Sequence, residues 1–132
     1  MRYLLAGAVA GNLHGIVRAT RDVDVLVPRD PSNAARLLDA LSALPYGIAT
    51  ELDPEVVAAK PFTIIGDDPR VDVLTVAGGV TFDRAYPGRL VRRIEGVRVP
   101  YLGRADFVRS KQTGRPQDVA DLEHLGESGH VR

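Results

Sequence analysis

The clearest pattern in the chain is an alternation of valine and aspartate between positions 22 and 27. Val23, Val25 and Val27 alternate with Asp22 and Asp24, and a period of two is typical of a half-buried β-strand. Residues two apart in a strand project from the same face, so we expect the two carboxylates to lie side by side.

Apolar runs elsewhere predict a mixed sheet with helices packed on it. A short strand after Tyr3 breaks at Gly7 into a short helix that stops at Gly15, and Asp30 or Ser32 is expected to cap the next helix. Further helices are expected at 31–44 and 54–59, strands at 62–65, 71–76, 90–94 and 97–102, and two closing helices at 104–113 and 116–125. This order predicts an α+β fold with α/β-type packing, in a single domain over residues 1–125 and with a flexible tail at 126–132.

Asp22 and Asp24 are the first candidates for chemistry. Two carboxylates held side by side on a packed strand repel each other and lose hydration, unless a cation occupies the gap between them. Mg²⁺ prefers oxygen ligands and binds one or two protein carboxylates together with phosphate oxygens of a substrate. The pair therefore indicates a metal–phosphate site. The alternative is a solvated strand face from which both aspartates point to water.

Composition excludes several classes of protein. The chain has 132 residues, of which 45% are hydrophobic, enough for one ordinary domain with a core. It contains no cysteine, so disulfides and thiolate metal sites are excluded. Without a membrane-length apolar run or a signal-peptide pattern, we expect a cytoplasmic protein with no membrane partner.

Basic residues gather in the second half of the chain, although the formal net charge is zero. Such a patch could hold a triphosphate or an RNA backbone. No aromatic residues are interleaved with it in the way typical of RNA-binding segments, so we favour an exposed hairpin with solvated arginines. The residues are Arg84, Arg89, Arg92, Arg93, Arg98, Arg104, Arg109 and Lys111.

Two separated motifs carry a resemblance to a known family. The first motif is a Gly7 turn and a short helix ending in Leu13-His14-Gly15, followed by Arg18-x-Thr20-x-Asp22-x-Asp24. The second motif is Lys111-x-x-Gly114-Arg115-Pro116-x-Asp118-x-x-Asp121-Leu122. In this order they resemble the nucleotidyltransferase superfamily with the DNA polymerase β-like fold. The closest likeness is to small prokaryotic members of the abortive-infection and toxin–antitoxin group.

This resemblance implies a nucleotidyltransferase fold and a reaction. An NMP would pass from an NTP to a hydroxyl of RNA, a protein or a small molecule, with Mg²⁺ or Mn²⁺ as cofactor. It implies a third acid on a later strand, for which Asp72 is the best candidate, so that Asp22, Asp24 and Asp72 would be catalytic and metal-binding. The alternative for Asp72 is an exposed strand position.

The nucleotide-binding candidates are Gly7, Ala8, Arg18, Thr20 and Lys111. A glycine turn lets backbone approach a ligand, and a helix start offers free N–H groups to an anion. Ala8 departs from the family, which has Gly or Ser there, and its methyl group could crowd a phosphate. Lys111 would neutralise phosphate or be a solvated surface lysine, and Arg18 and Thr20 would contact phosphate or cap the turn before the strand.

Two function classes remain open at this stage. The first is the active transferase, as part of a toxin–antitoxin or phage-defence system. The second is a non-catalytic relative that keeps the fold as a binding module, such as an antitoxin-like partner, acting with a protein partner or as a homo-oligomer. The three acids favour the first class, and Ala8 favours the second. His14 is expected to be packed rather than a ligand, and Asp118 and Asp121 to anchor the last helix.

Overall fold

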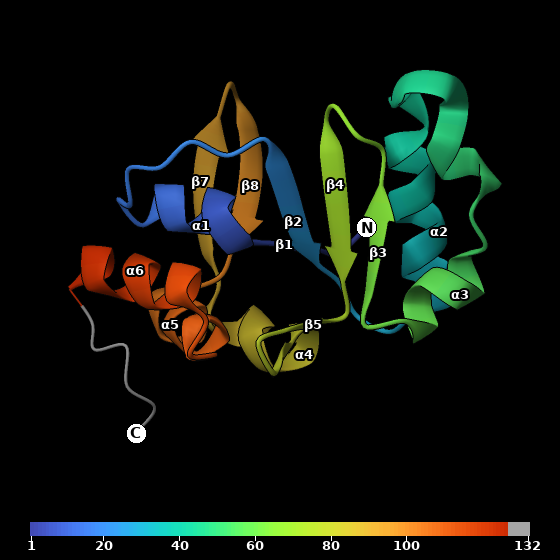
Figure 1. Cartoon of the computed structure of the whole chain (residues 1–132). Helices are drawn as coiled ribbons and strands as arrows, with labels where there is room; N and C mark the ends of the chain where they lie inside the picture. The colour runs from blue at the N-terminus through green and yellow to red at the C-terminus, as the bar shows by residue number, and fades with distance from the viewer. Residues whose placement is uncertain (127–132) are drawn as a thin grey trace.

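The computed structural model describes residues 1–126, so the tail predicted at 126–132 lies, apart from Gly126, outside the described residues. Six strands form one mixed sheet in the order β3-β4-β2-β1-β8-β7 (Figure 1). β2 is parallel to β4 and antiparallel to β1, β1 is parallel to β8, and β3–β4 and β7–β8 are antiparallel pairs. The bounds are β1 Leu4–Ala6, β2 Asp22–Leu26, β3 Phe62–Ile65, β4 Arg70–Leu74, β7 Leu90–Ile94 and β8 Val97–Tyr101.

Helices lie on both faces of this sheet (Figure 1). They are α1 Gly7–Leu13, α2 Pro31–Ala40, α3 Pro54–Ala59, α4 Phe82–Ala85, α5 Arg104–Lys111 and α6 Pro116–Leu125. The 3₁₀ turns η1 Leu41–Ala43, η2 Pro45–Glu51 and η3 Tyr86–Gly88 and a two-stranded sheet of β5 Val76–Ala77 and β6 Val80–Thr81 complete the fold. The α+β prediction is therefore confirmed, and α5 and α6 close the chain as expected.

Strand periodicity divides the core into two clusters, one on each face. Val25 and Val73 pack toward α2 and α3 with Leu38, whereas Leu4 and Leu26 pack on the other face. This second face is covered by α1, α4 and α5, through residues that include Ala10, Phe82 and Phe107. Because residues alternate between faces, the aspartates of β2 share the face of Leu26, beside the helices α1 and α5.

Most predicted elements are present. Several end a residue or two early, such as the strand expected at 71–76, which ends at Leu74, and the helix expected at 104–113, which ends at Lys111, and three further differences stand out. The helix expected at 31–44 ends at Ala40, because the chain turns into 3₁₀ geometry ahead of Pro45, whose ring disfavours an α conformation at Leu44. β4 begins at Arg70, one residue earlier than expected, and this brings a charged side chain into the sheet. The small elements between positions 76 and 88 were not predicted, since two-residue strands carry no readable period.

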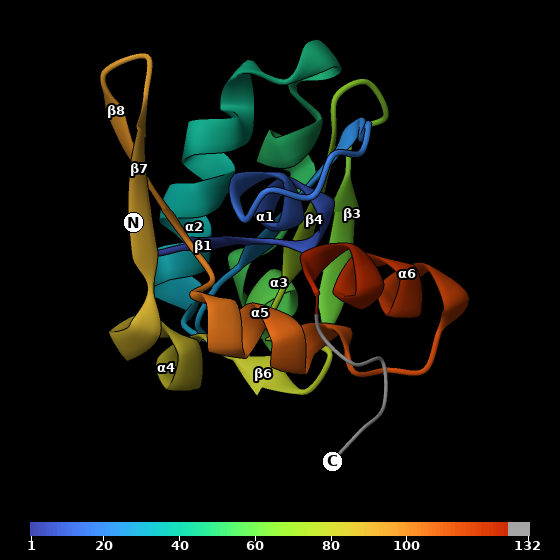
Figure 2. The same cartoon turned by 90° about the vertical axis from the view of Figure 1, so that its left-hand side faces the viewer.

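The β7–β8 hairpin lies at one edge of the sheet, and Figure 2 shows its tip extending away from the helices. Every residue of β7 is exposed, so this strand adds little to the core, whereas Tyr101 at the end of β8 is buried in it. No helix among the described residues is long and apolar enough to cross a membrane.

Candidate functional site

Asp24 and Asp72 lie opposite each other on the parallel strands β2 and β4. Asp22 lies two residues earlier on β2, where it is aligned with Arg70. Aligned residues of neighbouring strands project from the same face of a sheet, so all four side chains share the face that carries α1 and α5. The register thus places Asp22 and Asp24 on one face as their spacing predicts, and it adds Asp72, the third acid that the resemblance implies. The chemical roles of the three acids stay a prediction.

Arg70 is the site residue that sequence reasoning missed. Its guanidinium donates to both carboxylate oxygens of Asp72, at 2.8 and 3.1 Å, and its Nε lies 4.0 Å from Asp22 Oδ2. One positive charge therefore lies between two of the three acids. The signal was present in the sequence, because an arginine two residues before an aspartate shares its face in a strand.

Asp24 differs from its neighbours in having no hydrogen-bond donor or ion-pair partner within the described part of the chain. Burial raises the pKa of this carboxyl above its ordinary value, and the negative charges of Asp72 and Asp22 raise it further, while Lys111 and Arg70 act in the opposite direction. A half-buried carboxylate beside another carboxylate is a site where a cation would be stabilising.

Gly7 sets how closely α1 approaches the acids. Its backbone φ is +58°, a conformation that glycine adopts readily, and a Cβ at this position would overlap with the Asp24 carboxylate. The glycine predicted from the sequence is therefore required by both backbone conformation and space.

An ion-pair network ties the closing helices to the segment before β2. Lys111 is buried, with Nζ 3.1 Å from Asp121 and 3.3 Å from Asp118. Arg18 donates to both carboxylate oxygens of Asp121, at 3.0 and 2.8 Å, and Arg115 lies 2.9 Å from Asp118. The solvated-lysine alternative for Lys111 is therefore wrong, and the anchoring role expected of Asp118 and Asp121 is confirmed.

The same network shifts the acidity of Asp118. Burial would raise the pKa of this carboxyl, but a hydrogen bond from Thr113 and the charges of Lys111 and Arg115 outweigh it and hold the pKa below its ordinary value. Asp118 is therefore held as a carboxylate that stabilises the link between α5 and α6.

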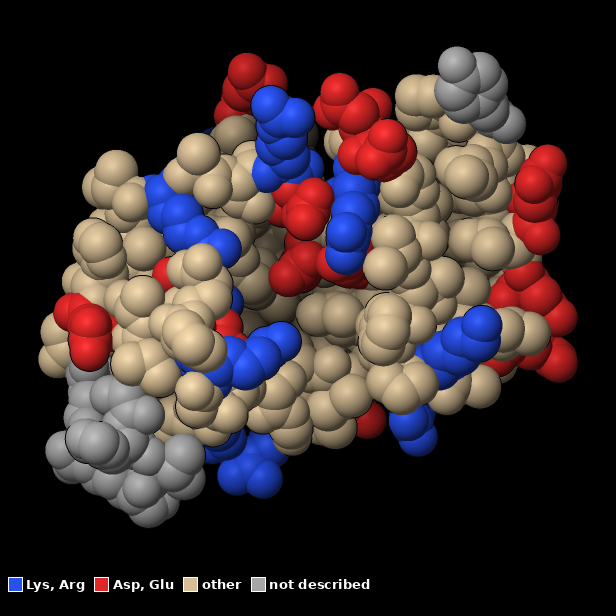
Figure 3. Space-filling view, viewed as in Figure 1, with Lys and Arg blue, Asp and Glu red and all other residues tan. Residues whose placement is uncertain are grey.

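Two adjoining hollows of about 270 and 230 Å³ lie beside the acids. Figure 3 shows acidic and basic atoms together around a depression in the middle of this face. Gly7 lines the first hollow, Ala8, Arg18 and Thr20 line the second, and Lys111 lines both. All five nucleotide-binding candidates are thus brought to one place. The residues common to both hollows are Asp24, Asp72, Lys111, Arg115 and Asp118.

Two of the predicted residues also have a structural role. Thr20 Oγ1 accepts a hydrogen bond from the backbone N–H of Asp22 at 3.3 Å, so it caps the turn before β2 as one alternative proposed. His14 lies 2.7 Å from the carbonyl oxygen of Leu102 through Nε2, and its ring contacts Tyr101 and Phe107. His14 is therefore a packed residue, in agreement with the prediction.

The donor set fits a hard cation in its chemistry, since it consists of carboxylate oxygens beside a glycine turn. Within residues 1–126, however, no three Asp, Glu, His or Cys side chains converge as a ready metal-binding group. The Asp72 carboxylate is instead held by Arg70. A cation bound by Asp22, Asp24 and Asp72 would therefore compete with Arg70 for the oxygens of Asp72.

The sequence matches no protein-family model, and a search of curated proteins finds no relative. The function of the site must therefore be inferred from its own residues: three acids on one sheet face, an arginine paired with one of them, and two hollows lined by both acidic and basic residues.

Proposed function

We propose that this chain is a metal-dependent nucleotidyltransferase with the DNA polymerase β-like fold, which transfers an NMP from an NTP to an acceptor hydroxyl. The observation that carries the proposal is the alignment of Asp24 with Asp72 across β2 and β4, with Asp22 on the same face. Carboxylates gathered on one sheet face, at a hollow whose wall also includes Arg18, Lys111 and Arg115, suit a phosphate substrate held with a divalent cation.

Asp22, Asp24 and Asp72 would hold Mg²⁺ or Mn²⁺ after Arg70 has released Asp72. When bound, the cation supplies positive charge to the phosphate oxygens and lowers the barrier to displacement. Arg70, once released, would remain beside the acids as a further positive charge on the β4 side of the site.

Lys111, Arg18 and Arg115 place positive charge on the other side of the acids, where they line the hollow next to Ala8 and Thr20. Each of these cations is paired with Asp118 or Asp121, so a triphosphate in this hollow would share them with those carboxylates. In the reaction, a bond forms between the acceptor oxygen and the α-phosphorus, and the bond from that phosphorus to the bridging oxygen breaks, so that pyrophosphate leaves. Asp72, freed from Arg70, would accept the proton of the acceptor hydroxyl.

A non-catalytic binding module is the second candidate, and one observation favours it. Arg70 already offsets part of the negative charge of Asp22 and Asp72, so the acids need no metal to be stable. The Ala8 methyl group, which lines the hollow, acts in the same direction if it limits the space for a phosphate. Such a module would keep the surface for a partner and bind no Mg²⁺–NTP.

Thermal unfolding with Mg²⁺ and each NTP separates the two candidates. A ligand that binds only the native state at a hundred times its Kd adds about 2.7 kcal/mol to the free energy of unfolding, which raises Tm by several degrees. We expect this rise with at least one NTP, and we expect Asp24→Asn to abolish it. Asp39→Asn, an exposed change on α2, is the matched control. An unchanged Tm with every NTP would favour the binding module.

A further inference from the structure

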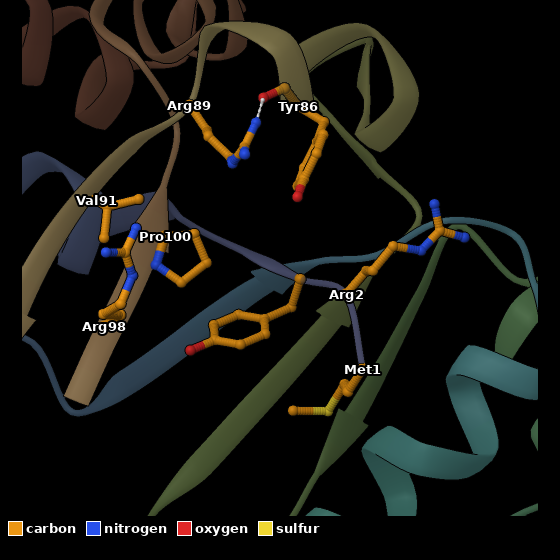
Figure 4. A pocket seen from close by; sticks show the side chains of 8 residues that line it. Met1, Arg2, Tyr86, Arg89, Val91, Arg98 and Pro100 are labelled. Carbon is orange, nitrogen blue, oxygen red and sulfur yellow. Dashed lines mark hydrogen bonds between the residues drawn. The ribbon is translucent and has the colours of Figure 1, made fainter.

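A second cavity of about 300 Å³ lies at the β7–β8 edge and shares no residue with the hollows beside the acids. Figure 4 shows that its walls come from the segment before β1, from the η3 turn and from both strands of the hairpin. Its volume is at the lower end of the range of about 300–1,000 Å³ for small-molecule sites. The cavity wall includes Arg2, Tyr3, Tyr86, Arg89, Arg98 and Pro100.

The cavity is basic. Three of its wall residues are arginines and none is acidic. The Arg98 side chain makes no hydrogen bond or ion pair within the described residues, whereas the Arg2 guanidinium lies 3.6 Å from Asp30 and 5.6 Å from the centre of the Phe82 ring. Arg89 donates to the carbonyl oxygen of Tyr86 at 3.0 Å and keeps other N–H groups free. Planar guanidinium groups with free donors are suited to phosphate oxygens.

The cavity is also aromatic. The Arg89 guanidinium carbon lies 3.8 Å from the centre of the Tyr86 ring, so the two flat groups are stacked. The Tyr86 ring is supported from behind by buried Phe82, at a centroid distance of 5.1 Å. Tyr3 and Pro100 contribute further flat, largely apolar surface. An aromatic ring stacked with arginine is a common support for an unstacked nucleobase.

These observations revise the interpretation of the basic patch. The sequence places no regular aromatic pattern among the arginines, so a solvated hairpin was expected. The fold brings Tyr3 to Arg98 from the opposite end of the chain, and it stacks Tyr86 with Arg89. Tyr86 comes from the sequence of the patch itself, between Arg84 and Arg89, and Tyr3 is added by tertiary structure.

We propose that this cavity binds a nucleotide unit, a phosphate joined to a flat base, within single-stranded nucleic acid. The arginines bind the phosphate and the Tyr86–Arg89 stack receives the base. A duplex would not present its bases to so small a cavity, because they are paired and stacked. A free mononucleotide carries the same chemistry and is the other source of the ligand. The proposal goes beyond the transferase function and uses none of its residues.

Fluorescence anisotropy of an unstructured ten-nucleotide RNA tests the proposal. Arg98→Gln removes one unpaired charge and Tyr86→Leu removes the stacking ring. Each is expected to weaken binding at least about five-fold, a small effect for the loss of a phosphate or stacking contact. Arg84→Gln removes an exposed arginine that does not line the cavity and is the matched control. It is expected to change binding less than two-fold, because a charge without a direct contact is screened at about 0.15 M salt. Thermal unfolding checks that each variant is folded. If the Tyr86→Leu variant does not fold, the RNA affinity of Arg98→Gln alone decides the result.

Competition identifies the ligand and its source. Displacement of the RNA by AMP or UMP supports a free nucleotide as ligand, and displacement by unlabelled RNA alone supports a strand. Equal displacement by inorganic tripolyphosphate or by an oligoglutamate peptide would overturn the proposal, because neither carries a base. So would an equal loss of binding in Arg84→Gln and Arg98→Gln, or the absence of RNA binding tighter than about 100 µM, the weak end of non-specific binding.

Discussion

Arg70 binds Asp72 two residues along the same strand, and both carboxylate oxygens accept a hydrogen bond from its guanidinium, at 2.8 and 3.1 Å. A bidentate pair of this kind is among the stronger charge-assisted contacts in proteins. A divalent cation at the proposed site would use the same oxygens. Arg70 and the cation therefore compete for Asp72.

Removing this competitor is expected to strengthen metal binding. Arg70→Gln should raise the affinity for Mn²⁺ in the absence of nucleotide by roughly ten-fold, the equivalent of about 1.4 kcal/mol. Isothermal titration calorimetry measures this Mn²⁺ affinity. Arg36→Gln, an exposed change on α2 at the opposite face of the sheet, is the charge-matched control. Unchanged or weaker Mn²⁺ binding by the Arg70 variant would show that the arginine does not compete with the cation.

Gly7→Ala is expected to destabilise the fold and displace Asp24. A left-handed non-glycine residue costs about 1–2 kcal/mol, and the added Cβ would overlap with the Asp24 carboxylate in addition. Gly47→Ala is a close control, because Gly47 has the same φ of +58° and its Cβ would meet only an ordinary 3.6 Å contact with Thr50. Urea unfolding should show a larger loss for Gly7→Ala, and equal losses would mean that Asp24 adjusts without cost.

Much of the site could be predicted from the sequence because strand periodicity is local. Asp22 and Asp24 share a face through their spacing alone, and Asp72 stands out as an acid within an apolar run. The alignment of Asp24 with Asp72 could not be derived in this way, since it depends on the register of two strands separated by α2, α3 and β3. The resemblance indicated the third acid but not the register.

The pairing of Arg70 with Asp72 and the burial of Lys111 were not predicted from the sequence, each for a physical reason. Arg70 was outside the strand as predicted, so its shared face with Asp72 was not considered. Lys111 is buried because Asp118 and Asp121 on the following helix turn toward it. Only the packing of α5 against α6 brings these three residues together, and no local pattern reports that packing.

Ala8 is expected to limit the binding of nucleotide. It lines the hollow beside Asp22 and Asp24, so it does not pack away from the site. Ala8→Ser adds a hydroxyl donor at nearly the same volume and should tighten Mg²⁺–NTP binding several-fold, about the effect of one hydrogen bond to a charged group. Ala8→Val should weaken it. Titration of Mg²⁺–NTP into the wild type and the two variants measures these affinities. Equal affinities would show that Ala8 has no effect on nucleotide binding.

Asp118 is expected to stabilise the fold in a pH-dependent manner. Its pKa in the folded protein is below the ordinary value of 3.8, so its contribution is present above that pH and is lost as the pH falls through the folded-state pKa. Asp118→Asn should therefore cost about 2 kcal/mol at neutral pH, and the difference from wild type should shrink as the pH falls below the ordinary value of 3.8. Urea unfolding at several pH values measures it. Asp39→Asn is the control. A difference in unfolding free energy between wild type and Asp118→Asn that stays constant with pH would contradict the lowered pKa of Asp118.

Transfer of the α-phosphate is the most direct test of the transferase proposal. The protein is incubated with Mg²⁺, a cell extract and an NTP labelled at the α- or the γ-phosphate, for each of the common NTPs. We expect α-label from at least one NTP to become attached to a component of the extract, no attachment of γ-label, and loss of the signal in Asp24→Asn but not in Asp39→Asn. No transfer of α-label by the wild-type protein from any NTP, with Mg²⁺ or Mn²⁺, would contradict the account.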